Sequence, residues 1–120
     1  MLIVFIIGLA LLLVHEMDAA RNMEWKMFVG LRSMEERAAY HLFVAIHIPL
    51  YCVALFFLLS EYYVVAWVLV DLFVIAHALI HILFRKHKEN QFNAFSHSVI
   101  YAAGACGFLH LSLLLTAHFA

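Results

Sequence analysis

Charged residues are scarce in this chain: Asp, Glu, Lys and Arg together make up 12% of its 120 residues. Hydrophobic residues, by contrast, make up 68%, and the mean hydropathy is +1.00. A soluble domain of this length has no interior large enough to hide that much apolar surface. The composition therefore predicts a membrane protein that consists of a single domain.

Basic residues in particular are few, and this excludes a further class of partner. The chain has 7 Lys and Arg residues against 8 Asp and Glu, and its formal net charge is −1. No tract of Lys or Arg offers a surface for a phosphate backbone. We therefore expect no nucleic-acid partner.

Two further absences concern cysteine and the N-terminus. There are only 2 cysteines, Cys52 and Cys106, and each lies inside an apolar run. We expect them to be buried as small hydrophobic residues rather than joined in a disulfide. The first apolar run lacks the basic start and the A-x-A cleavage site of a signal peptide, so we expect it to remain as a helix.

What the chain does contain is four long apolar segments. They run over about residues 1–20, 40–59, 62–84 and 95–120, each close to the roughly 20 residues that span a hydrocarbon core. The connections between them are short. The sequence therefore predicts an all-α, integral membrane four-helix bundle. We expect a capping box over residues 33–36 to open the second helix, and Asn90 or Asn93 to cap the fourth.

The first connection has a pattern of its own. Methionine and leucine recur there at helical spacing, with charged residues between them, at Met23, Met27, Leu31 and Met34. This pattern predicts a short interfacial amphipathic segment between the first two spans. A solvated loop with incidental methionines is the alternative.

The basic residues predict the orientation of the bundle. All 7 lie in the first and third connections, at Arg21, Lys26, Arg32, Arg37, Arg85, Lys86 and Lys88. Cytoplasmic loops are enriched in Lys and Arg, so the positive-inside rule predicts an N-out, C-out topology. The first and third connections would then face the cytoplasm.

The 9 histidines are the least expected feature of so apolar a chain. In the predicted topology, polar side chains from all four helices meet in the cytoplasmic half of the membrane. Ionisable groups are costly there, at about 2.5 kcal/mol or more for a charged side chain, and usually mark function. We therefore predict a metal site at this depth, with ligands drawn from His15, His47, His77, His81 and His97.

The spacing of these histidines favours some ligands over others. His77 and His81 are one helical turn apart and share a stripe, as two ligands from one helix usually do. We expect these two, His97, and either His15 or His47 to hold the metal. The remaining histidines have other expected roles. His41, His87 and His118 would be interfacial anchors, and His110 a hydrogen-bonded histidine within the bundle. Asp71 has no partner visible in the sequence.

A histidine site of this kind suits zinc, which lowers the pKa of a bound water towards about 7. Glu16 and Asp18 are the candidate catalytic residues, as general base or as partner to His15. A site reached from lipid favours a lipid-like amide or ester as substrate, and thus a hydrolase with membrane lipid around it. Iron, with one or two ions, is the alternative metal, and would make the chain a lipid oxidase or hydroxylase.

Two alternatives lie outside this chemistry. Haem b held by histidines such as His97 and His110 would make an electron-transfer protein, although these two face about 140° apart on an ideal helix. A non-catalytic metal-binding subunit of a larger complex is the other. Small residues at Ala103 and Gly107 in the fourth span permit close helix contact, and with it a homo-oligomer.

The stretch from His15 to Trp25 resembles known families. It reads His-Glu-Met-Asp-Ala, followed by Glu24 and Trp25. This is similar to two small families of bacterial membrane proteins, one defined by an H-x-x-E-E motif at this point and one of no known activity with an HEMDA…EW stretch. Here Asp18 and Ala19 stand where the first family has two glutamates. The resemblance implies a metal-binding, multi-pass protein of the bacterial inner membrane, and we expect Glu24 and Trp25 to cover its site.

Overall fold

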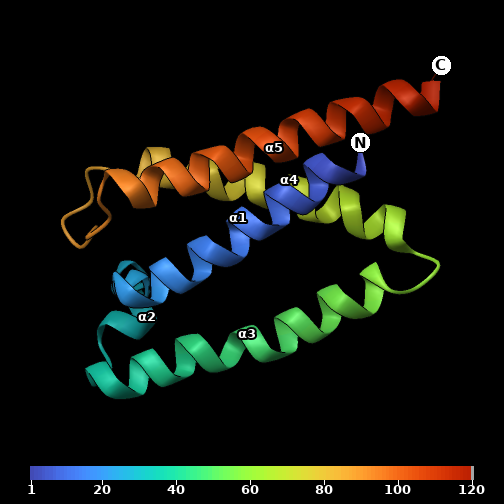
Figure 1. The fold of residues 1–120 in the computed structure, drawn as a ribbon. Helices are drawn as coiled ribbons and strands as arrows, with labels where there is room; N and C mark the ends of the chain where they lie inside the picture. Colours follow the sequence, from blue (N-terminus) through green and yellow to red (C-terminus); the bar gives the residue numbers. More distant parts are fainter. Residues whose placement is uncertain (120) are drawn as a thin grey trace.

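The computed structural model describes residues 1–119, and over that range it contains helices but no strand. Four long helices form the body of the molecule: α1 (Leu2–Arg21), α3 (Glu36–Leu58), α4 (Tyr63–Leu83) and α5 (Ala94–Phe119). Two short elements, the 3₁₀ helix η1 (Glu24–Met27) and α2 (Val29–Arg32), connect α1 to α3. Both chain ends lie at one end of the bundle, and the α1–α3 and α4–α5 connections lie at the other (Figure 1).

The four long helices match the number and the approximate places of the predicted spans. Their apolar stretches of 20, 23, 21 and 25 residues are long and apolar enough to cross a membrane. Helix α3, which corresponds to the second predicted span, begins at Glu36, whereas that span is predicted to begin at about residue 40. Of the predicted fourth span, Ala120 lies outside the described residues.

Helix α5 packs closely against both α1 and α4, whereas α3 lies to one side of them (Figure 1). Small residues permit this closeness. A Cβ on Gly107 would lie 2.5 Å from Cγ2 of Val74 and 3.1 Å from the carbonyl oxygen of Asp71, both on α4. Ala103 is fully buried. The small residues of α5 thus serve contacts within the chain, and a homo-oligomer stays a prediction.

We expect Gly107→Ala to lower the thermal stability of the protein in detergent. The added methyl group meets a stiff β-branched side chain and backbone, and neither can move aside easily. Overpacking of this kind costs about 1–3 kcal/mol. Gly30→Ala is the matched control, because a Cβ added to Gly30 would have no atom within 4 Å. Equal melting temperatures for the two variants would contradict this account of the α4–α5 contact.

The predicted N-terminal cap is present at α5 but not at α3. Asn93 caps α5, since its Oδ1 accepts a hydrogen bond from the Ser96 amide. At α3 the predicted capping box is wrong. The carboxylate of Glu35 accepts from the amides of Arg37 and Ala38, while the Ser33 hydroxyl donates to the Gly30 carbonyl. These two amides hold the pKa of exposed Glu35 below its ordinary value.

The two cysteines are free, as predicted, but they are not both buried. Cys106 is half-buried on α5, and Cys52 is exposed on α3. The reason is that α3 turns most of its surface away from the other helices. Only 6% of its most apolar stretch is buried, against 22–28% for α1, α4 and α5.

Candidate metal centre

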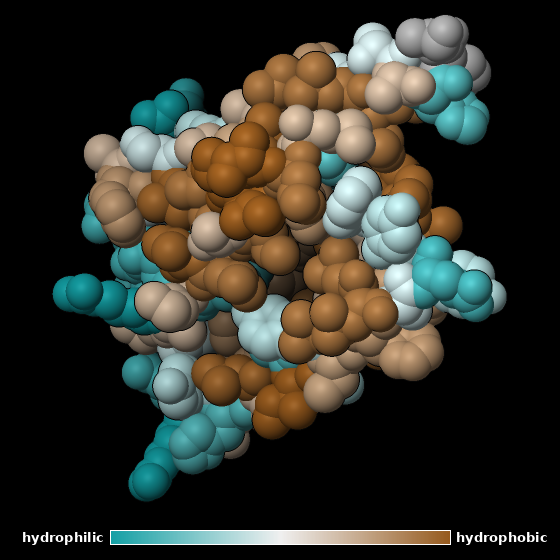
Figure 2. Space-filling model, turned by 45° about the vertical axis from the view of Figure 1, so that its right-hand side comes forward, coloured by the Kyte–Doolittle hydropathy of each residue, from teal (hydrophilic) through white to brown (hydrophobic). Residues whose placement is uncertain are grey.

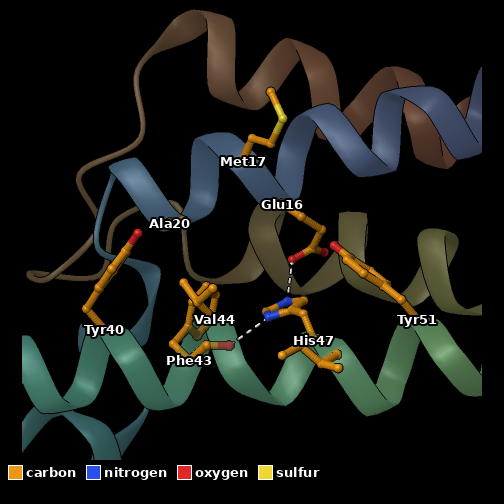
Figure 3. Close-up of a pocket in the computed structure, with 9 residues that line it drawn as sticks. Glu16, Met17, Ala20, Tyr40, Phe43, Val44, His47 and Tyr51 are labelled. Carbon is orange, nitrogen blue, oxygen red and sulfur yellow. Dashed lines mark hydrogen bonds and ion pairs between the residues drawn. The ribbon is translucent and has the colours of Figure 1, made fainter.

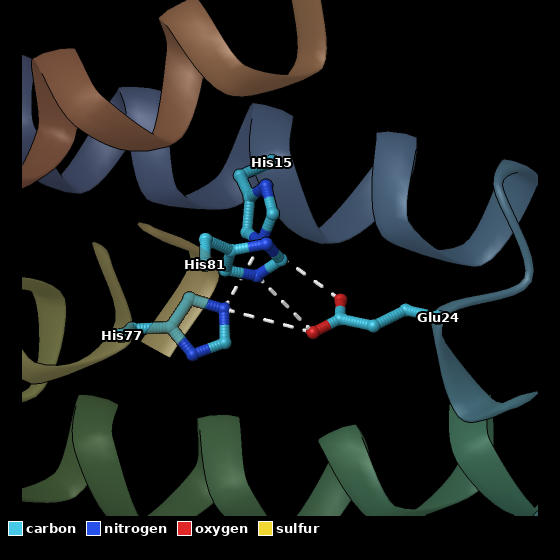
Figure 4. A group of neighbouring side chains, drawn as sticks. All are labelled: His15, Glu24, His77 and His81. Carbon is cyan, nitrogen blue, oxygen red and sulfur yellow. Dashed lines mark hydrogen bonds and ion pairs between the residues drawn. The ribbon is translucent and has the colours of Figure 1, made fainter. Parts of the chain in front are cut away.

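Four potential ligands meet near the end of the bundle that carries η1 (Figure 4). They are His15 from α1, Glu24 from η1, and His77 and His81 from α4, and one ligand atom from each lies within 4.8 Å of all the others. His77 and His81 share a stripe of α4 because they are one turn apart. The group can therefore hold a metal ion.

The distances within the group suit a single ion. Nε2 of His15 lies 3.0 Å from Nε2 of His77. One carboxylate oxygen of Glu24 is 3.8 Å from Nε2 of His15, and the other is 3.3 Å from Nε2 of His81 and 4.0 Å from Nε2 of His77. In a tetrahedral zinc site with bonds of about 2.1 Å, neighbouring ligand atoms are about 3.4 Å apart. The observed spacing brackets that value.

The burial and hydrogen bonding of these four residues also favour a metal site. His15, His81 and Glu24 are all buried. Nδ1 of His15 and Nδ1 of His81 have no hydrogen-bond partner among the described residues. The Nε2 atoms of His15, His77 and His81 all lie within 4.0 Å of the Glu24 carboxylate, as ligands around a common centre would.

The backbone at the end of α1 brings Glu24 into this group. Met23 has a φ of 55°, in the left-handed region, so the chain turns sharply before η1. Trp25 then anchors η1, because it is buried in a cluster with Ala19, Ala39 and Phe43. The sequence places Glu24 in an interfacial segment that covers the site. The structure makes it a member of the site.

Glu24 also carries the negative charge that the histidines face. Burial alone would raise the pKa of the Glu24 carboxyl. The histidines, His81 first among them, more than offset burial and hold this pKa below its ordinary value. The carboxylate is therefore ionised at neutral pH and available as a ligand or a base.

An aromatic side chain closes one side of the group. The ring of Phe92, in the segment before α5, lies 5.7 Å from the ring of His15 and 4.9 Å from that of His81. On the α4 side, Phe73 stacks on His77 at 5.3 Å. These rings help to exclude water, which strengthens electrostatic interactions inside the site.

The structure brings three of the five predicted metal ligands together, and His47 and His97 are not among them. Nε2 of His47 lies 2.8 Å from a carboxylate oxygen of Glu16, between α1 and α3. The ring of His97 stacks on Tyr101 at 5.6 Å. His47 is outside the group because it faces Glu16 of α1 rather than the four ligands. Glu16 is outside because successive residues of a helix point about 100° apart, which separates it from His15.

Asp18, the other predicted catalytic residue, is also outside the group. One of its carboxylate oxygens is buried and makes no hydrogen bond to any described residue. Its backbone carbonyl accepts hydrogen bonds from Asn22 at the end of α1. Asp18 therefore lies near the site without facing the same point as the four ligands.

A second buried polar pair lies further along the bundle, between α4 and α5. Nδ1 of His110 is 2.6 Å from Oδ2 of Asp71, and both residues are buried. The close approach of Gly107 to Asp71 explains the contact, because His110 follows one turn later on the same face. The prediction of a hydrogen-bonded bundle histidine is confirmed. Its partner is not visible in the sequence because it lies on another helix.

Comparisons with known proteins place the chain in a family. It matches no curated protein and no solved structure. One family model matches residues 1–117, and it is described as a family of unknown function (DUF6713). Since that match covers nearly the whole sequence, the chain belongs to this family of unknown function.

Proposed function

We propose that this chain is a membrane metalloenzyme that binds a zinc ion and hydrolyses a lipid-like amide or ester. The observation that carries the proposal is the convergence of three histidines and one glutamate from α1, η1 and α4 on one point. Three imidazoles with one further position are typical of catalytic zinc sites. Imidazole ligands also suit iron, so the identity of the metal is an outcome of the test.

The residues in and around the group would have different roles in the reaction. His15, His77 and His81 hold the ion, and Phe92 keeps bulk water from their rings. A bound zinc ion supplies Lewis acidity and lowers the pKa of its water. Glu24 is ionised beside the histidines, so it can act as the fourth ligand or accept a proton from that water. It belongs to a short 3₁₀ helix, and its position depends on the anchoring of Trp25.

The distribution of the basic residues supports a cytoplasmic location for this site. Four of the 7 basic residues lie in or beside the connection that supplies Glu24, at Arg21, Lys26, Arg32 and Arg37. The positive-inside rule would put this end of the bundle at the cytoplasmic face, with both chain ends outside. We propose that the protein lies in the bacterial inner membrane in this orientation.

Elemental analysis of the purified protein tests the proposal. We expect about one zinc per chain, the number that a single four-ligand group holds. Iron in place of zinc would favour the oxidase or hydroxylase alternative. A Soret band would show haem and contradict the proposal. Protein that stays metal-free after incubation with zinc would overturn it.

Catalysis needs a separate measurement. We expect the zinc-loaded protein to hydrolyse p-nitrophenyl laurate in detergent, dipicolinic acid to stop the reaction, and added zinc to restore it. Metal without hydrolysis of this ester, or of a matching lauroyl amide, would contradict the enzyme and favour the metal-binding subunit. Hydrolysis that survives complete removal of the metal would point to a contaminating esterase.

A further inference from the structure

A cavity of about 430 Å³ lies between α1 and α3, and none of the four residues of the metal centre lines it (Figure 3). Its volume is within the range of small-molecule sites. Most of its lining is apolar, with Met17, Phe43, Val44 and Ile48 among the side chains. The function proposed above for the metal centre uses none of these residues.

The polar part of the lining is a hydrogen-bonded pair, Glu16 and His47. Nδ1 of His47 lies 2.7 Å from the Phe43 carbonyl, which can only accept, so Nδ1 carries a hydrogen. Nε2 is 2.8 Å from a carboxylate oxygen of Glu16. Figure 3 shows the Tyr51 hydroxyl pointing toward Glu16 from the other side.

The cavity is open to the surroundings of the bundle. Met17 is 70% exposed and Ile48 65% exposed, although both line it. Helix α3 leaves most of its apolar surface uncovered, and Figure 2 shows apolar side chains over most of one face of the molecule. In a membrane these surfaces contact lipid. An apolar molecule would therefore enter the cavity from the side.

A second cavity, of about 500 Å³, continues the first toward the end that carries η1. The two cavities share Ala20 and Tyr40 in their linings. The second one has charged side chains, including Glu35 and Arg37, where the first has mostly apolar ones. Together they form a groove whose first part is mostly apolar and whose second part is charged.

We propose that this groove binds a single-chain amphiphile whose polar group is an uncharged amide or ester. The polar group would lie beside Glu16, His47 and Tyr51 in the first cavity, which no Lys or Arg lines, so nothing next to it would neutralise a phosphate or a carboxylate. The hydrogen-bonded Glu16–His47 pair and the Tyr51 hydroxyl offer donors and acceptors for a carbonyl or an N–H group instead. The proposal rests on the proposed function for the substrate class and adds a binding site for it, but the binding itself requires no metal.

Photocrosslinking tests the groove directly. The probe is an N-lauroyl amide with a diazirine at the end of its chain, added to the full chain in detergent, and the labelled residues are identified by mass spectrometry. We expect labelling to concentrate on the stretches 16–20 and 40–51. Val44→Trp fills the cavity and should reduce this labelling about tenfold. Ile46→Trp is the matched control, because Ile46 is exposed on the same helix and does not line the cavity.

A second variant tests the polar pair. His47→Phe removes the imidazole that pairs with Glu16 but keeps a ring of similar size. We expect it to weaken labelling by the amide probe and to leave labelling by a diazirine-bearing alkane unchanged. If both probes respond equally, the pair does not recognise the polar group. Should Val44→Trp fail to fold, this comparison still decides the proposal.

The groove is overturned if the amide probe labels the lipid-facing residues of all four long helices evenly, as surrounding lipid would, or if Ile46→Trp reduces labelling as much as Val44→Trp. Metal content is measured on the same samples. Concentrated labelling of a metal-free protein would refute the metalloenzyme and keep the groove. Even labelling of a zinc-containing protein would refute the groove alone.

Discussion

Joint replacement of His77 and His81 by alanine is expected to abolish metal binding. Zinc content measured by mass spectrometry should fall from about one ion per chain to the background level, because only His15 and Glu24 would remain as ligands. Two ligands from separate elements do not hold zinc against a chelator. Replacement of His81 alone should already weaken binding strongly, since His81 is buried and its Nε2, at 3.3 Å, lies closer to the Glu24 carboxylate than those of His15 and His77.

His97→Ala is the matched control for this experiment. The sequence favours His97 as a ligand, but the structure stacks it on Tyr101. We therefore expect the variant to keep its zinc, as we do for His47→Ala. If His97→Ala loses the metal while the joint variant retains it, the four-residue group is not the site. Circular dichroism should show equal helix content in all variants, so that loss of metal is not loss of fold.

Glu24→Gln separates binding from catalysis within the same group. The amide keeps the shape of the side chain but cannot accept a proton as a carboxylate can. We expect weaker zinc binding and loss of p-nitrophenyl laurate hydrolysis even when zinc is supplied in excess. Full activity of the zinc-loaded variant would remove Glu24 from the proposed chemistry.

The second large effect concerns stability. Asp71→Ala should lower the free energy of unfolding by about 3–5 kcal/mol, as expected when one partner of a buried pair is removed. His110 is fully buried, and within residues 1–119 its Nε2 has no hydrogen-bond partner, so Asp71 supplies the hydrogen bond of the ring. The rings of Phe5 and Trp67, at 5.2 and 5.6 Å, leave the imidazole in an apolar setting.

Thermal unfolding in detergent measures this effect. Joint Asp71→Leu and His110→Leu replacement removes both polar groups, so it should be less destabilising than Asp71→Ala alone. Ser112→Ala is the neutral control, since its hydroxyl is exposed and donates to a carbonyl of its own helix. An unchanged melting temperature for Asp71→Ala would contradict a stabilising role for the pair. Zinc content should stay at the wild-type level in each of these variants.

The fold itself is largely predictable from the sequence. Long apolar segments with short connections predict helices long enough to cross a membrane, because in lipid every backbone polar group must be satisfied within its own segment. The stripe shared by His77 and His81 also follows from local geometry, since residues four apart always lie on one face of a helix. The cap at Asn93 is a local interaction of the same kind.

The predicted depth of a residue in the membrane says less about its contacts than the direction in which its side chain points. The sequence places His15, His47, His77, His81 and His97 at one level, and that level alone makes each of them a candidate for one site. Helices at one level can still face different neighbours. The direction of its side chain takes His47 to Glu16 across the α1–α3 groove rather than to the metal centre.

By itself, therefore, the sequence determined the four apolar helices, their approximate bounds and the presence of a polar cluster at one end. Only the tertiary structure decided which polar groups meet. It added Glu24 through a left-handed turn at Met23, and it joined Asp71 to His110 through the close approach of Gly107. The physical reason is that helix formation depends on neighbours along the chain, whereas contacts between helices depend on how each one is rotated and packed.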